Sequence, residues 1–188
     1  MISLEIRPLT RLDRERLREL MGGYVTTQHY AVQKQEGDAA TTITLTLQLL
    51  PQPYSKNYWD SLSEDDLGRY ADLLAEGFSL GAYQEGEWVG VALAEAQPWN
   101  RMLNVWELHV HPQHRGAGIG RRLVDELAVR ARAAGLRALA VETQNTNVAA
   151  VRFYRGVGFA IEGIDLSYYT NTDMEDGEVA IFLKRKLP

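Results

Sequence analysis

Three glycines occupy alternate positions within the segment HPQHRGAGIGRRL, residues 111–123. Gly116, Gly118 and Gly120 lack Cβ atoms, so a ligand can approach the backbone closely at these positions. The segment leads into an expected helix, whose first backbone N–H groups are unpaired and attract a phosphate group. The spacing is neither that of a P-loop nor the Gly-x-Gly-x-x-Gly of dinucleotide-binding proteins. Two interpretations stay open: a pyrophosphate site of another kind, or a glycine-rich turn with solvated arginines at Arg115, Arg121 and Arg122.

A second polar pattern lies in the segment NTNVAAVRFYRGVGF, residues 145–159. Asn147 and Tyr154 are two helical turns apart, so the pattern places them on one face of a helix. Such a stripe suits a ligand that extends from the glycine segment. Three other positions are expected to face elsewhere and to pack against a sheet: Ala149, Ala150 and Phe153.

Two signatures in the sequence resemble those of a known family. The first is Gln113-x-x-Gly116-x-Gly118 after ELHVHP, and the second is Asn147-x-x-Ala150-x-x-Phe153-Tyr154-x-x-x-Gly158-Phe159. In this order they resemble the paired signatures of the GNAT N-acetyltransferases, over residues 78–187. Within that family, the segments WNRMLNVWELHV, VETQNTNVAAVRFYRGVGF and GIDLSYY resemble the streptothricin acetyltransferases, which acetylate an amine of a β-lysine-bearing antibiotic.

The resemblance implies a mixed α/β fold with a central, mostly antiparallel sheet and splayed parallel strands at a cofactor cleft. It implies acetyl-CoA as co-substrate, with the pantetheine arm bound like an added strand by the backbone of Leu108, His109 and Val110. Asn147 then touches the pantetheine side, and Tyr154 lies near the sulfur. The pyrophosphate is expected on the residues of the glycine segment: Arg115, Gly116, Ala117, Gly118, Ile119, Gly120 and Arg121.

Acetyl transfer to an amine needs a neutral amine and a proton for the departing thiolate. The sequence has no cysteine, so we expect direct attack within a ternary complex rather than a cysteine acyl-enzyme. On the resemblance, Tyr154 is the expected general acid. Glu107 in VWELHV is the candidate base, or else an ordinary half-buried strand residue, and a phase change between Val105 and Trp106 predicts a β-bulge that re-aims it. His109 is an alternative base acting through water, because imidazole titrates near neutrality.

The acceptor is expected to be a small cationic molecule. Glu142 ends a buried strand, where it either lines the acceptor site or caps the following turn. Trp99, Tyr168 and Tyr169 are candidates for an aromatic wall around an alkylammonium group, or are ordinary core and rim residues. Asp165 is a candidate anchor for a second amine, on the resemblance alone.

The histidines do not indicate a metal site. His109 and His111 share a strand face, but His114 follows a proline turn, and no carboxylate completes a ligand spacing typical of zinc. We therefore expect no metal.

Composition limits the remaining classes of protein. The chain has 188 residues, of which 45% are hydrophobic and 24% charged, as is ordinary for a globular protein with a sizeable core. The net charge of −5 argues against nucleic acid as a partner and fits a cationic substrate. The segment MISLEIRPLT is unlike a signal peptide, and no run is long enough to span a membrane. No membrane partner and a cytoplasmic location are therefore expected.

Hydrophobic periodicity predicts the elements that must position these residues. Helices are expected at residues 10–21, 63–77, 118–134 and 147–158. Strands are expected at residues 2–9, 41–50, 78–99 (two strands with a turn at Glu85-Gly86), 101–112, 137–143, 159–169 and 177–187. Residues 24–40 and 51–59 are expected to be irregular. The order predicts a mixed α/β sheet with one parallel crossover near its middle.

These inferences favour one GNAT domain over residues 1–188, with residues 1–77 as an N-terminal arm and acceptor-side elements, and residues 78–188 as the acetyl-CoA-binding core. The expected function is acetylation of a primary amine of a small cationic molecule, a streptothricin-type antibiotic being the first choice. A peptide, protein or polyamine amine is the alternative acceptor. A non-catalytic module that binds acetyl-CoA is the alternative from another class. Homodimers are frequent in the family, so a homodimer is expected on the resemblance alone.

Overall fold

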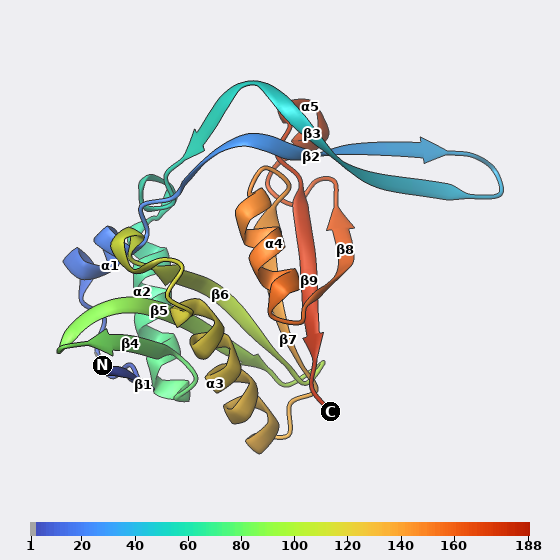
Figure 1. Ribbon diagram of the computed structural model, residues 1–188. Coiled ribbons are helices and arrows are strands. Elements are labelled where there is room, and N and C mark those ends of the chain that lie inside the picture. The colour runs from blue at the N-terminus through green and yellow to red at the C-terminus, as the bar shows by residue number, and fades with distance from the viewer. Residues whose placement is uncertain (1–2) are drawn as a thin grey trace. The chain divides into compact units, whose positions relative to one another are not determined.

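The computed structural model describes residues 3–188 and divides them into two compact units (Figure 1). Unit 1 consists of residues 3–23, Asn57–Val141 and Lys184–Pro188. Unit 2 consists of Tyr24–Lys56 and Glu142–Leu183. The strands β7 (Ala138–Gln144) and β9 (Ala180–Lys186) contribute residues to both units. The expected division of a single domain at residues 77 and 78 stays a prediction.

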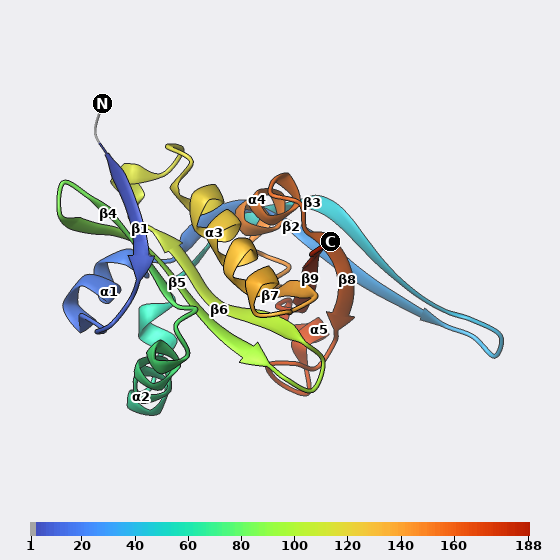
Figure 2. The same cartoon turned by 90° about the horizontal axis from the view of Figure 1, so that it is seen from below.

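Unit 1 is a mixed sheet covered by helices. Its strands follow the order β1-β4-β5-β6-β7, in which β6 and β7 are parallel and the other neighbours antiparallel. The remaining strands are β1 (Leu4–Pro8), β4 (Leu80–Gln84), β5 (Glu87–Gln97) and β6 (Met102–Val110). The helices are α1 (Arg14–Leu20), α2 (Glu64–Leu73) and α3 (Ile119–Ala133). Figure 2 shows α1 and α2 on one side of β5 and β6, and α3 on the other.

Local sequence explains where these elements begin and turn. The Ser63 hydroxyl accepts the backbone N–H of Asp66, whose carboxylate accepts the backbone N–H of Ser63, so a capping box starts α2. Glu85 and Gly86 both have left-handed backbones, with φ angles of 52° and 85°. This is the geometry of a tight hairpin turn, and the predicted hairpin between β4 and β5 is confirmed. The predicted parallel crossover is also confirmed, since α3 connects β6 to the parallel β7.

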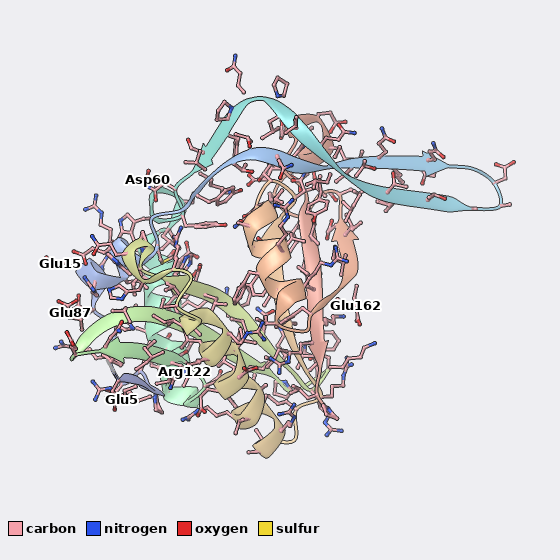
Figure 3. The ribbon with its side chains drawn as sticks, viewed as in Figure 1. Glu5, Glu15, Asp60, Glu87, Arg122 and Glu162 are labelled. Carbon is pink, nitrogen blue, oxygen red and sulfur yellow. The ribbon has the colours of Figure 1, made fainter. Side chains whose placement is uncertain are left out.

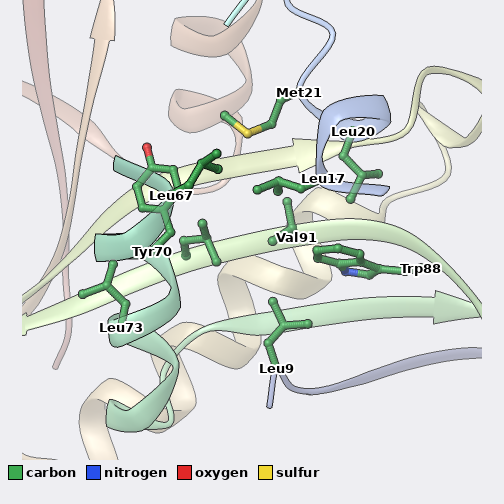
Figure 4. Close-up of a cluster of buried hydrophobic side chains, with 10 residues drawn as sticks. Leu9, Leu17, Leu20, Met21, Leu67, Tyr70, Leu73, Trp88 and Val91 are labelled. Atoms are coloured by element: carbon green, nitrogen blue, oxygen red, sulfur yellow. The ribbon is translucent and has the colours of Figure 1, made fainter. Parts of the chain in front are cut away.

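A hydrophobic cluster lies between the strands and the two helices α1 and α2 (Figure 4). The helices bury one face each, at the spacing expected of amphipathic helices. The members of the cluster are Leu9, Leu17, Leu20, Met21, Leu67, Tyr70, Leu73, Trp88, Val91 and Leu93. Two members carry a polar group that needs a hydrogen-bond partner: Tyr70 has a hydroxyl, and Trp88 has an indole N–H.

Strand β6 contains one extra residue opposite β5. Leu93 is paired with Glu107, whereas the next residue of β5, Ala94, is paired with Val105, so Trp106 has no separate partner. Because side chains alternate along a strand, the extra residue reverses the faces of the residues that follow. Glu107 consequently shares a face with Leu93, a member of the cluster with α1 and α2. The predicted bulge is confirmed.

Unit 2 combines a two-stranded hairpin with a second group of elements. The hairpin consists of β2 (Tyr24–Glu36) and β3 (Thr41–Lys56), which are antiparallel. The other elements are α4 (Val148–Gly156), β8 (Ala160–Asp165) and the short helix α5 (Asp173–Asp176), and β9 lies between β7 and β8. Figure 1 shows the closed end of the hairpin extending away from α4 and β8. No helix within residues 3–188 is both long and apolar enough to cross a membrane.

The expectation of irregular structure in residues 24–40 and 51–59 is wrong for most of both segments. Residues of β2 and β3 pair across the hairpin, and pairs such as Val32–Leu45 and Tyr30–Leu47 place apolar side chains on one face. Prolines within β3 argued against a strand. They lie in the stretch 50–53, where the register shifts between the pairs that flank it, and a bulged edge strand tolerates proline.

Candidate functional site

The glycine segment forms the turn from β6 into α3. Gly116 and Gly118 have φ angles of 81° and 78°, in the left-handed region that glycine adopts without strain. Gly118 is the N-cap residue of α3, and no described side chain caps the helix. Within residues 3–188, no heavy atom beyond the glycine and its immediate chain neighbours lies within 4 Å of the position that a Cβ atom would take at Gly116 or Gly118. The turn therefore fits a phosphate group, which binds backbone N–H groups at a helix N-terminus.

Two arginines near this turn donate hydrogen bonds to backbone carbonyls. Arg115 donates through Nε to the carbonyl of Val110 at 3.1 Å. Arg122, labelled in Figure 3, donates through Nη2 to the carbonyl of Leu4 in β1, also at 3.1 Å. Arg121 is exposed. These contacts hold both ends of the turn to the strands of unit 1.

Glu107 belongs to a hydrogen-bonded cluster in unit 1. Its Oε2 is 2.6 Å from Nε2 of His109, and its Oε1 accepts a hydrogen bond from the Tyr70 hydroxyl of α2 at 2.5 Å. The ring of Tyr58 lies edge-on against that of His109, with centroids 5.4 Å apart. The side chains of His109 and Glu107 are 11% and 15% exposed. The two candidate bases therefore form one partly buried pair.

The Tyr70 hydroxyl is a neutral donor. Burial raises the pKa of Tyr70 well above its usual range, and the adjacent Glu107 carboxylate raises it further. The ring lies on the buried stripe of α2 with Leu67 and Leu73, so packing sets the position of the hydroxyl. That position determines where one oxygen of Glu107 is held.

Tyr154 lies on the buried face of α4 in unit 2, together with Val148 and Val151. Its ring centroid is 5.3 Å from that of Phe153 and 5.3 Å from that of Phe159. Tyr154 is 8% exposed. Its contacts with these two aromatic rings therefore set the orientation of its side chain.

Asn147 is the N-cap residue of α4. Its Oδ1 accepts the backbone N–H of Ala150 at 3.0 Å. Asn147 is buried, as Tyr154 is, in keeping with the shared face that their spacing predicts. The expectation that Ala149 packs against the sheet is wrong, because Ala149 is exposed and Val151 takes the buried position.

Glu142 is paired with Tyr169 within unit 2. The Tyr169 hydroxyl donates a hydrogen bond to Oε1 of Glu142. Burial raises the pKa of Tyr169, and the charge of Glu142 raises it further. Lys56 forms an ion pair with Glu178, and its ammonium nitrogen lies 5.6 Å from the centroid of the Tyr169 ring. The face of Tyr169 thus already holds the ammonium group of a lysine.

The other acceptor-side candidates are more exposed. Trp99 is 85% exposed and lies in the turn between β5 and β6 of unit 1. In unit 2, Asp165 ends β8, and its Oδ1 accepts the backbone N–H two residues further on at 3.0 Å. Tyr168 is 44% exposed, and its ring packs edge-on against Phe182 with centroids 5.3 Å apart.

The histidines beside the glycine segment bind other groups of the protein. The rings of His111 and His114 are edge-on, with centroids 5.7 Å apart, and Nδ1 of His114 is 2.9 Å from Oε1 of Gln84. Within residues 3–188, no three His, Cys, Asp or Glu side chains are grouped so that they could hold a metal ion.

The structure brings some of the predicted site residues together and adds two. Glu107 and His109 are in contact in unit 1, and Asn147 and Tyr154 lie on the same helix in unit 2. Tyr70 and Tyr58 were not predicted. The apolar stripe of α2 includes Tyr70, but a stripe does not reveal a partner that lies 37 residues further along the chain.

Comparison with known proteins gives the same assignment as the motifs. The model of the acetyltransferase (GNAT) family matches residues 44–159. Streptothricin acetyltransferase of Streptomyces lavendulae is 38% identical over 104 residues, which are 55% of this chain and 54% of that protein. L-methionine sulfoximine/L-methionine sulfone acetyltransferase of Salmonella typhimurium is 33% identical over 54 residues, 29% of this chain and 32% of that protein. The chain therefore spans about half the length of the first relative and less of the second.

The fold agrees with a solved structure over nearly its whole length. Nourseothricin acetyltransferase matches with a TM-score of 0.76 and 28% identity, covering 98% of this chain and 99% of that one. The family model covers more than half of the chain, and its range includes both the glycine turn and the whole α4 signature. The predicted resemblance is confirmed, and the chain belongs to the GNAT family of acetyltransferases.

Proposed function

We propose that this chain is an N-acetyltransferase that uses acetyl-CoA to acetylate a primary amine of a small cationic acceptor, with a streptothricin-type antibiotic as the first candidate. The observation that carries the proposal is the uncapped, left-handed glycine turn at the start of α3, directly after the bulged strand that bears Glu107. Membership of the GNAT family supports the reaction. The similarity to streptothricin acetyltransferase supports the choice of acceptor.

The residues of the turn fit the pyrophosphate of acetyl-CoA. Backbone N–H groups from residues 115–121 would hold it, because Gly116 and Gly118 leave the backbone open and α3 has no side-chain cap. The backbone of residues 108–110 and the side chain of Asn147 would hold the pantetheine arm. Bound acetyl-CoA supplies the acetyl group as a thioester.

Two side chains are proposed to move protons in this reaction. The amine nitrogen attacks the thioester carbonyl carbon, and Glu107 takes the amine proton directly or through water, with His109 as its hydrogen-bonded partner. The carbon–sulfur bond then breaks, and the Tyr154 hydroxyl gives its proton to the departing sulfur. A direct transfer in a ternary complex is economical, because the sequence holds no cysteine to form an acyl-enzyme.

Acidic and aromatic side chains are proposed to bind the cationic acceptor. Glu142 and Asp165 supply negative charge, and Trp99 and Tyr168 supply exposed aromatic surface. The Lys56 ammonium beside Tyr169 illustrates the chemistry that an alkylammonium group would use. The net charge of −5 favours the approach of a cation.

The test is acetyl-CoA-dependent release of free thiol, measured with a thiol-reactive dye, with streptothricin, a polyamine and a peptide as alternative acceptors. The protein adds no thiol background, since it contains no cysteine. Rapid release with streptothricin, and acetylated antibiotic in the mass spectrum, would support both reaction and acceptor. Release with only the polyamine or only the peptide would identify that amine as the acceptor in place of the antibiotic. Acetyl-CoA binding by calorimetry without release on any amine would favour a non-catalytic module.

A further inference from the structure

Tyr70 lies outside both family signatures, yet its hydroxyl binds the candidate base. The residue is on α2, is 7% exposed, and donates its hydrogen to Oε1 of Glu107 at 2.5 Å. The other carboxylate oxygen of Glu107 is 2.6 Å from Nε2 of His109. Both oxygens of Glu107 are therefore held, one by a helix and one by its own strand.

We infer that Tyr70 is a positioning residue for the proton-accepting pair Glu107–His109, an inference that rests on the proposed acetyl transfer. In that transfer an N–H bond of the acceptor amine breaks, its electron pair stays on nitrogen, and the proton moves to the pair. Tyr70 gives up no proton in this step. It determines where the carboxylate lies, and through the carboxylate how the imidazole ring is turned.

The hydrogen bonds of the cluster select one tautomer of the neutral His109 ring. An ionised carboxylate can only accept, so Nε2 of His109 donates in the short contact, and in the neutral imidazole Nδ1 is then the acceptor. The ring of Tyr58 packs against the imidazole edge-on and limits its rotation. If the Glu107 side chain could rotate, it would no longer hold the imidazole of His109 in one orientation. The hydrogen bond from the Tyr70 hydroxyl prevents this rotation.

The bulge in β6 makes the contact possible. On a regular strand Glu107 would share a face with Val105, whereas the extra residue Trp106 turns it to the face of Leu93 and α2. Helix α2 also holds the bulge itself, since the guanidinium group of Arg69 lies 3.9 Å from the centroid of the Trp106 ring. Neighbouring residues of one helix thus fix both the bulge and the carboxylate that it re-aims.

The first test compares Tyr70→Phe with Tyr83→Phe. Both replacements remove one hydroxyl from a tyrosine that packs in or against the same hydrophobic cluster, but no contact between Tyr83 and Glu107 is found in the described residues. We expect Tyr70→Phe to lower kcat by about 10- to 100-fold, the size expected when a reacting group is misplaced by about 1 Å. The KM for acetyl-CoA and the melting temperature should stay near those of the Tyr83→Phe protein.

A double-mutant cycle separates positioning from packing. In a Glu107→Gln background, Tyr70→Phe should lower kcat little further, because the group that Tyr70 positions has already been removed. Loss of a purely structural tyrosine would lower kcat by the same factor in both backgrounds. Equal losses in the two backgrounds would overturn the inference.

A measurement without turnover keeps this inference distinct from the proposed function. Side-chain ¹⁵N NMR of the protein, which has four histidines, reports which nitrogen of His109 carries the proton, with His109→Gln to assign the signals. We expect the Nε2-protonated form in the unaltered protein and a mixture of tautomers in Tyr70→Phe. Failure of every amine to react would contradict the proposed function, whereas an unchanged His109 spectrum in Tyr70→Phe would overturn the role of Tyr70.

Discussion

The side chain of Asn147 accepts the backbone N–H of Ala150, so a residue of the second family signature also begins helix α4. Replacement of such an N-cap residue by alanine commonly costs about 1 kcal/mol of the free energy of unfolding. We expect that loss in Asn147→Ala, measured by urea unfolding. Asn147→Asp should recover the stability, since aspartate caps as well as asparagine does.

The same pair of variants tests the proposed contact with acetyl-CoA. Aspartate keeps the cap but has no amide donor, so Asn147→Asp should bind acetyl-CoA more weakly in calorimetry although it is stable. Full affinity in Asn147→Asp would show that the side chain serves the helix alone.

Tyr154→Phe keeps the ring that packs against Phe153 and Phe159 and removes only the hydroxyl. We expect kcat to fall by one to three orders of magnitude, in keeping with about 10²–10⁴-fold for general acid–base catalysis. Acetyl-CoA affinity, measured by calorimetry, should hardly change. Tyr54→Phe, which removes a hydroxyl from β3 of the same unit, serves as the control and should retain kcat. Normal turnover in Tyr154→Phe would remove the residue from the acid role.

Gly118 offers a test of the phosphate turn with its own control. Any side chain at this position is strained, because φ is 78°. Gly118→Ala introduces that strain without charge, whereas Gly118→Glu also places a carboxylate beside the first backbone N–H groups of α3. We expect calorimetry to show weakened acetyl-CoA binding in the alanine variant and none in the glutamate variant. Equal affinities in the two would mean that the pyrophosphate binds elsewhere.

Asp173 should make the stability of the protein depend on pH in the acid range. Burial alone would raise the pKa of Asp173, but hydrogen bonds donated by the backbone N–H groups of Tyr169 and Thr170 and by the Thr170 hydroxyl outweigh it and lower the pKa. The carboxylate therefore stabilises the fold above about pH 4, the range in which an unfolded aspartate ionises, and this stabilisation is lost as the pH falls through the lowered value.

The corresponding variant is Asp173→Asn. Its melting temperature should lie several degrees below that of the unaltered protein at pH 7, and the gap should narrow as the pH falls below about 4. Asp38→Asn, at an exposed position of the β2–β3 hairpin, should show neither effect. A gap that stays constant down to pH 2 would contradict the assignment of this carboxylate.

The sequence predicted elements whose apolar residues recur at a regular spacing. Helix α3 and strand β7 are clear from their own residues, and even the bulge before Glu107 is visible as a change of phase. The first part of β3 was also predicted, as a strand at residues 41–50. Strand β2 and the end of β3 were not, because β2 is rich in polar residues and two prolines interrupt β3. Cross-strand pairing between β2 and β3 stabilises the extended conformation, and this pairing cannot be inferred from either segment by itself.

The candidate site residues also differ in how far the sequence predicts them. The glycine turn and the Asn147–Tyr154 pair follow from local spacing. The contact of Tyr70 with Glu107 does not, because it joins a helix to a strand 37 residues further along the chain. A buried tyrosine can have a packing role or a functional role, depending on the hydrogen-bond partner of its hydroxyl. That partner is known only from the folded structure.

The division of β7 and β9 between the two units limits how the protein can be dissected or recombined. The chain passes from one unit to the other at four places: after Gly23, Lys56, Val141 and Leu183. Neither unit is thus encoded by one uninterrupted stretch of the gene, so a single crossover with a relative cannot exchange a whole unit. Exchange of a complete unit would require crossovers at all four of these boundaries, whereas point substitutions can change either unit in place.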